Sequence, residues 1–462
     1  MFISSDSYLK ILREPARFGR SRNLRGATAI MLALCSGASA HAQATGDKPA
    51  DATQAQPADT GLAEVIVTAQ RRGQNLQAVP IAVTSFNANM LAAAGVTSVG
   101  DLANVDSSLN MKIVSGAVAP FLRGIGSTNG STYGNESSVP VYIDGVYYTR
   151  QAAVFLQLAD IERVEVLKGP QGTLFGRNAS AGLIQIITRD PSLTDPALEV
   201  TAGYGNYNTG YGKLYASTPL GEGIAADISV VGSDQGDGWG KNLTTGHDTH
   251  QDRFLSVRSK FVAQLDTTKI TLAVYYGRDT ISQGIQDATY AGTLAATQAF
   301  YGPIRAVTSL PNFYDTTNAT DVHDDFVSYG GSLTIDQDLN FADLVSIAAG
   351  RNGDDYLSAS GDHTGEPWLL YNLSGVDRQL SEELQLKSKK DSPFDWIAGI
   401  YYLNSRQGYN PTNVTGDAIK AGGGLAENLY GEQQVNSVAA YTQETFHVIP
   451  DNTNLTVGSE PP

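Results

Sequence analysis

Cysteine is almost absent from this sequence. The 462 residues contain one cysteine, Cys35, which lies inside an apolar run near the N-terminus. Removal of that run would leave no thiol, so disulfides and thiolate metal sites are excluded from the remaining chain. Leu34 is not small, so Cys35 also lacks the small preceding residue that a lipoprotein attachment site needs.

Positive charge is also scarce. The chain has 31 Lys and Arg against 47 Asp and Glu, and six of the basic residues but only two of the acidic ones lie within residues 1–42. The remaining chain is therefore strongly acidic. Such a surface repels nucleic acid at long range, so we expect no nucleic-acid partner.

Long hydrophobic runs are missing as well. The longest, Ala27–Ala40, is too short to cross a membrane as a helix. Basic residues precede it, and small residues at 38, 40 and 42 follow it, in the order that a secretory signal peptide requires. We therefore predict a signal peptide over residues 1–42, cleaved after Ala40 or Ala42, rather than a buried helix.

The next two segments differ sharply in composition. Residues 43–63 are rich in Ala, Thr, Asp, Gln and Pro, which predicts a flexible tether. "EVIVTA", Glu64–Ala69, is strand-forming but has no neighbouring partner strand in the sequence. Its residues favour equally a peptide that adds to the sheet edge of another protein and the first strand of the next domain. In the first case it would be extended and weakly held.

Residues 71–193 are expected to form a small mixed α/β domain. "LANVDSSLNMKIV" predicts a short helix followed by a strand, and "VPVYIDGVYY", Val139–Tyr148, predicts a hairpin with an Asp-Gly turn. "IERVEVLKGPQGTLFGRNASAGLIQIITRDP", residues 161–191, predicts two central strands joined by glycine-rich turns. It lacks the Gly-Lys-Ser/Thr ending of a phosphate-binding loop.

From residue 194 onward the sequence has the pattern of an antiparallel β-barrel. Strands of about ten residues alternate apolar and polar positions, joined by short turns such as "LGEG" and "LDTTK" or by long polar loops, expected at 280–325 and 405–434. A soluble β-sandwich or a solenoid is the alternative. In the barrel the outward-facing residues would include Leu255, Val257, Leu272, Val274, Trp396 and Ile400.

These segments together resemble a known family. "EVIVTA", "RGIGS" at 123–127, "VPVYIDGVYY" and the 161–191 stretch resemble, in order and spacing, the TonB box and plug motifs of TonB-dependent outer-membrane receptors, and "LSEELQLKSK" at 380–389 resembles one of their early barrel strands. The resemblance implies a TonB box at 64–70, a plug over 71–193 and a barrel from 194 to 462. About 10–11 of the 22 strands expected for the family fit in this length, so we expect an incomplete, truncated barrel that does not close.

The resemblance also implies roles for particular residues. TonB would bind Glu64, Val65, Ile66, Val67, Thr68 and Ala69. The plug core motif would comprise Arg123, Gly124, Asp144, Gly145, Arg163, Glu165, Lys168, Gly169, Pro170, Gly172, Gly176, Arg177 and Gly182. The glycines, Gly172 among them, would form tight turns, and Arg163 and Arg177 with Glu162 and Glu165 would pair with charges on the barrel. Candidate ligand contacts are Asn129, Tyr133 and Tyr148.

The function implied is TonB-dependent uptake of a scarce nutrient across the outer membrane of a Gram-negative bacterium. The default cargo is an iron–siderophore complex, with glycans, aromatic compounds and cobalamin as alternatives. We expect a monomer that contacts lipid and TonB and needs no cofactor. A passive channel and a non-functional fragment are the alternatives. "HDTH" at 247–250 and His323 beside two aspartates are weak metal candidates, and no catalytic constellation suggests an enzyme.

Overall fold

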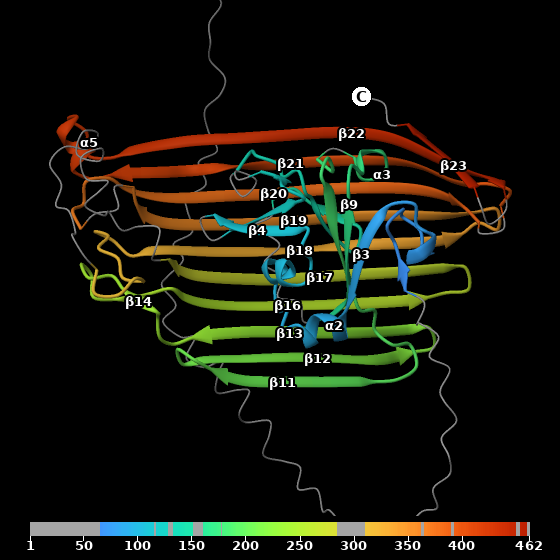
Figure 1. Ribbon diagram of the computed structural model, residues 1–462, viewed down its shortest axis with the longest axis horizontal. Helices are drawn as coiled ribbons and strands as arrows, with labels where there is room; N and C mark the ends of the chain where they lie inside the picture. Colours follow the sequence, from blue (N-terminus) through green and yellow to red (C-terminus); the bar gives the residue numbers. More distant parts are fainter. Residues whose placement is uncertain are drawn as a thin grey trace, which may run out of the picture. The chain divides into compact units, whose positions relative to one another are not determined.

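The structure is a computed structural model whose described residues form one unit with two parts (Figure 1). It describes residues 65–459 except 115–116, 128–132, 151–159, 177, 284–309, 362–364, 390–391 and 450–452. The expected signal peptide, the tether and Glu64 lie outside the described residues. Within the described part, no helix has the length and apolarity to cross a membrane.

The N-terminal part of the described chain, which we call the plug, contains short strands and helical turns. Its elements are β1 (Ile66–Val67), β2 (Gln74–Asn75), η1 (Leu76–Ala78), β3 (Ala82–Asn87), α2 (Ala88–Ala93), η2 (Val99–Asn104), β4 (Leu109–Val114), β5 (Ala117–Leu122), β6 (Ile125–Gly126), β7 (Val141–Ile143), β8 (Val146–Tyr148), β9 (Ile161–Lys168), α3 (Gly172–Phe175) and β10 (Gly182–Thr188).

The plug is organised around the β9–β10 hairpin. Its five-stranded sheet has the order β3-β9-β10-β7-β8, with β10 and β7 parallel and the other pairs antiparallel. β9 and β10 are almost entirely buried, as their branched apolar residues favour. The predicted central position of the 168–188 stretch is therefore confirmed, as are the 139–148 hairpin and the change from helical turn to strand over 99–114.

The second part is one large sheet, which we call the wall. Its strands are β11 (Ala197–Gly205), β12 (Thr209–Gly221), β13 (Ile224–Gln235), β16 (Gln251–Gln264), β17 (Thr268–Gln283), β18 (Val322–Asp338), β19 (Ala342–Ser360), β20 (Leu370–Ser388), β21 (Asp395–Thr415), β22 (Glu427–Ile449) and β23 (Thr453–Ser459). Outside it lie β14 (Gly240–Lys241), β15 (Asp248–Thr249) and α5 (Asp417–Ala421).

The eleven wall strands are antiparallel and follow chain order from β11 to β23 (Figure 1). Among the described residues, the first and last strands do not pair with each other, so the sheet is not closed into a barrel. Both the expected strand count and the expected open sheet are confirmed. The short turns predicted at 220–223 and 265–269 are also present, with two residues between β12 and β13 and three between β16 and β17.

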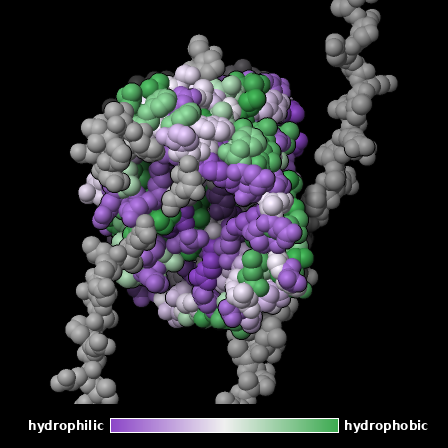
Figure 2. Space-filling view, turned by 90° about the vertical axis from the view of Figure 1, so that its right-hand side faces the viewer, coloured by the Kyte–Doolittle hydropathy of each residue, from purple (hydrophilic) through white to green (hydrophobic). Residues whose placement is uncertain are grey.

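The two faces of the wall differ as the alternation predicts. On β16, Ser256, Arg258 and Lys260 are buried, whereas Leu255 and Phe261 are exposed. Leu272 and Ile400 are exposed in the same way on β17 and β21. Figure 2 shows a hollow whose visible lining is largely hydrophilic. The wall therefore presents polar side chains inward and apolar side chains outward, as lipid contact requires.

One connection differs from expectation. The prediction of a polar loop at 405–434 is wrong for most of that range, because β21 extends to Thr415 and β22 starts at Glu427. In the metal candidate "HDTH", His247 binds the Asp321 carboxylate, with 2.6 Å between Nδ1 and Oδ2. Among the described residues, no group of three or more potential ligands could hold a metal ion.

Candidate functional site

Several of the residues that the sequence singled out lie where the plug contacts the wall, which we call the seam. Two apolar clusters span it. One includes plug residues Ile143 and Val166 with Phe326 and Ala349 of the wall. The other brings Val67 and Ala69 together with Leu403 and Tyr441 of the wall. Ion pairs also cross the seam.

The segment Ile66–Ala69 is held much more firmly than the sequence suggested. β1 pairs antiparallel with β2, and Val67 and Ala69 are both 0% exposed. The Thr68 amide lies 3.0 Å from both carboxylate oxygens of Glu165, and its hydroxyl accepts a 2.7 Å hydrogen bond from Gln185. The expectation of a weakly held strand is therefore wrong, because apolar burial and a buried carboxylate fix it.

Arg71 continues this attachment onto the wall. Its guanidinium lies 3.2 Å from the Glu383 carboxylate of β20 and 4.5 Å from the centre of the Phe175 ring. Tyr441 donates a 2.6 Å hydrogen bond to the same carboxylate. Burial alone would lower the pKa of Arg71, but the Glu383 charge together with Tyr142, Tyr441 and Tyr401 more than offsets it and raises the pKa, so the guanidinium stays charged.

A second set of ion pairs joins the turn of the β7–β8 hairpin to β16. Asp144 and Gly145 both have positive φ, as the predicted Asp-Gly turn requires. The Asp144 carboxylate accepts hydrogen bonds from the Thr188 amide and hydroxyl at 2.8 and 2.7 Å and pairs with Arg258. Lys260 reaches Asp190 at 2.9 Å. The turn thus ties the end of the plug sheet to the wall.

A third set of contacts joins the plug residues Tyr133 and Arg150 to β19 and β21 of the wall. Arg150 pairs with Asp355 of β19 at 2.8 Å and lies 4.1 Å from the centre of the Tyr133 ring. Tyr133 packs edge-on against Tyr409 with ring centres 4.8 Å apart. Burial raises the pKa of Tyr133, so its phenol stays protonated and donates to Asp355.

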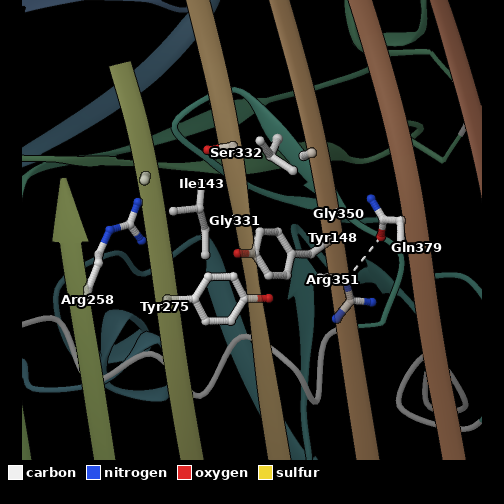
Figure 3. Close-up of a pocket in the computed structure, with 12 residues that line it drawn as sticks. Ile143, Tyr148, Arg258, Tyr275, Gly331, Ser332, Gly350, Arg351 and Gln379 are labelled. Carbon is white, nitrogen blue, oxygen red and sulfur yellow. Dashed lines mark hydrogen bonds between the residues drawn. The ribbon is translucent and has the colours of Figure 1, made fainter. Parts of the chain in front are cut away.

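Between these attachments lies a small pocket (Figure 3). Ile143, Val146 and Tyr148 of the plug face Arg258, Tyr275, Arg351 and Gln379 of the wall across it, while the residues from β17 to β19 that complete it are small. Arg351 binds the Gln379 side-chain oxygen at 3.1 Å. A small cavity thus remains between plug and wall at this position.

The remaining predicted residues have structural positions. Arg123 and Gly124 form the β5–β6 turn, and Lys168 binds Asp106 at 2.9 Å. Gly169, Gly176 and Gly182 have positive φ, and Pro170 follows the first of these turns. Gly172 does not, because it opens α3 with ordinary backbone geometry, so its expected turn role is wrong.

One further expectation needs correction. Arg163 pairs with Glu162 and Glu165 inside the plug rather than with wall charges, because its Nε lies 2.8 Å from the Glu165 carboxylate. Tyr133 and Tyr148 are 9% and 5% exposed at the seam, so this arrangement leaves little of either side chain for a ligand. Asn129 and Arg177 lie outside the described residues.

Sequence reasoning missed the wall partners Glu383, Arg258 and Asp355, and also Arg71. The one available signal was local: Arg71 and Arg72 directly follow the strand-forming segment, and Glu383 lies within the quoted "LSEELQLKSK" motif. Their pairing depends on the tertiary fold, which no spacing in the sequence indicates.

Known proteins share this combination of plug and wall. Residues 75–183 match the TonB-dependent receptor plug domain family. The pesticin receptor of Yersinia pestis is 28% identical over 195 residues, covering 42% of this chain and 28% of that protein. The catecholate siderophore receptor Fiu of Escherichia coli O6:H1 is 26% identical over 217 residues, covering 45% of this chain and 26% of that receptor.

Solved structures agree on the fold. The ferric yersiniabactin uptake receptor FyuA of Yersinia pestis superposes with a TM-score of 0.67 at 21% identity, over 82% of this chain and 56% of that one. The fold is thus a plug followed by the antiparallel wall of an outer-membrane receptor. The chain thus carries a plug domain of the TonB-dependent receptor type and is similar to receptors of the Gram-negative outer membrane. It spans about a quarter of the length of the two sequence relatives named above.

Proposed function

We propose that this chain acts in TonB-dependent uptake of an iron–siderophore complex across the outer membrane. TonB would capture the segment Glu64–Ala69 by strand addition, in which an extended backbone supplies the hydrogen bonds. The relatives support the cargo class, because their names include a catecholate siderophore receptor and a ferric yersiniabactin uptake receptor.

One observation favours TonB-dependent uptake over passive conduction through a channel. The segment Ile66–Arg71 is attached both to the centre of the plug, through Thr68 and Glu165, and to the wall, through Arg71 and Glu383. A force applied to the N-terminal side of this segment therefore acts on both attachments. Passive conduction requires no mechanical connection between an N-terminal segment and the plug.

The test compares two substitutions at Val67 in cells. Val67→Pro removes the amide N–H and restricts the backbone, whereas Val67→Ala only shortens the side chain. We expect Val67→Pro to abolish uptake of radioactive iron carried by yersiniabactin, a catecholate or pyoverdine while the cells still bind the complex. Val67→Ala should keep most of the uptake, and deletion of TonB should match Val67→Pro.

Normal uptake by Val67→Pro, or uptake that persists without TonB, would refute the proposal. Binding of the isolated TonB C-terminal domain to the purified chain supplies an independent check. Val67→Pro should weaken that binding and Val67→Ala should not.

A further inference from the structure

Glu165 occupies an unusual position for a carboxylate. It lies in the middle of β9, between Ser85 of β3 and Gln185 of β10, and is 0% exposed. A buried carboxylate is stable only where donors surround it. Here the donors come from two sources: Arg163 on the same strand and Thr68 from the segment that precedes the plug sheet.

Both polar hydrogens of Thr68, on its amide and on its hydroxyl, lie within hydrogen-bond distance of the Glu165 carboxylate. Its amide lies 3.0 Å from each Glu165 oxygen, and its hydroxyl lies 3.2 and 3.3 Å from them. Gln185 donates to the same hydroxyl, so the threonine is held from both central strands of the plug. Charge-assisted bonds of this kind are about twice as strong as neutral ones.

The other restraints on Ile66–Ala69 within the plug are fewer, and Arg71 attaches the next part of the chain to the wall. β1 and β2 pair over only two residue positions, with one more bond from the Leu76 amide to the Val65 carbonyl. Val67 and Ala69 add apolar burial. Thus the polar link between the segment and the plug sheet is concentrated at Glu165.

We propose that Glu165 is the positioning residue that holds the TonB-binding segment in its docked place and sets how readily TonB can capture it. This rests on the proposed function. When the segment leaves, the carboxylate loses its Thr68 donors in the centre of the sheet, so undocking and loosening of β9 are coupled. Glu165 thereby links the pulled segment to the strand at the centre of the plug.

The test measures how often the docked segment opens in the full chain without TonB. A Val67→Cys thiol, in a Cys35→Ser background, is buried when docked and reacts with a maleimide only after undocking. Since hydrogen bonds to a charged group contribute about 1.5–3 kcal/mol, we expect Glu165→Gln to speed the reaction roughly tenfold to hundredfold. Thr68→Ala should act similarly, and Thr68→Ser, which keeps the hydroxyl, should react nearly as slowly as the parent.

Glu162→Gln is the matched control. Glu162 also pairs with Arg163, but it is exposed and the structure gives it no contact with Thr68. It should leave the Val67→Cys rate unchanged. A second reporter, Ala181→Cys, lies in the other core cluster at 4% exposure, and its reaction should accelerate much less than that of Val67→Cys in every variant.

Two results would overturn the proposal: an unchanged Val67→Cys rate in Glu165→Gln, or an equal acceleration of Ala181→Cys, which would mean general loosening of the plug. Capture by the TonB C-terminal domain is then measured separately. Glu165→Gln should tighten it by the same factor as the opening, because fewer molecules are docked. Failure of TonB to bind any variant would refute the proposed function, while the thiol rates would still decide the role of Glu165.

Discussion

Arg71→Met is the substitution whose effect the structure predicts most clearly. The side chains of Arg71 and Glu383 are 8% and 4% exposed, and their charges lie 3.2 Å apart. Methionine fills much of the space against Phe175 but leaves the Glu383 carboxylate without its cation. Loss of one partner from a buried ion pair costs about 3–5 kcal/mol, because the remaining charge is desolvated and uncompensated.

The double variant Arg71→Met/Glu383→Leu separates charge from packing. It removes both charges, so we expect it to be less destabilised than the sum of the two single variants by more than about 1.5 kcal/mol, within the range for directly interacting residues. Hydrogen exchange of the β9–β10 peptides, followed by mass spectrometry, measures the opening free energy of the plug in each variant. Additive single effects, or a cost below about 1 kcal/mol for Arg71→Met, would refute the reasoning, because the ion pair would then be hydrated rather than buried.

The remaining predictions concern the plug core. Gly182→Ala should destabilise the plug by several kcal/mol, because φ is +136° and the added Cβ would lie 2.1 Å from the Leu167 carbonyl oxygen, whereas Gly172→Ala meets no atom within 4 Å and should be tolerated. Thermal unfolding distinguishes them, and equal midpoints would contradict the prediction. Hydrogen bonds from Ser108 and Lys168 outweigh burial and lower the pKa of Asp106 in the folded state. Its stabilising contribution is therefore complete above the unfolded pKa of about 3.9 and lost as the pH falls through the lower folded pKa. Asp106→Asn should flatten the acid side of the stability profile, and an unaltered profile would refute this assignment.

Local chemistry made much of the fold predictable. The Asp144-Gly145 turn, the buried β9 and β10 strands and the alternation along β16 each depend on neighbours close in sequence, and each was confirmed. The 405–434 loop was misjudged because polar side chains face the interior of the wall, so polarity there does not mark a loop.

The site was less predictable, for a physical reason. The Thr68 and Glu165 side chains meet across 97 positions, and Arg71 meets Glu383 only after both parts have folded. Neither pair has a periodicity or a spacing that one sequence can reveal. The glycine-rich stretch indicated tight turns correctly at Gly169, Gly176 and Gly182, but composition could not show that Gly172 begins a helical turn instead.

The polar inner face of the wall has a consequence for how the plug can be displaced. On β20 the buried side chains Asp377, Gln379, Ser381, Glu383 and Gln385 all have groups that water can solvate. When a hydrogen bond between plug and wall opens, water can replace the lost partner. Exchanging one such bond for a bond to water changes the free energy by only about 0.5–1.5 kcal/mol. The work of moving the plug is thus divided into many small, reversible steps. An apolar lining would instead have to be exposed to water in one step with a large free-energy cost, and it would leave a hydrophobic surface in contact with water.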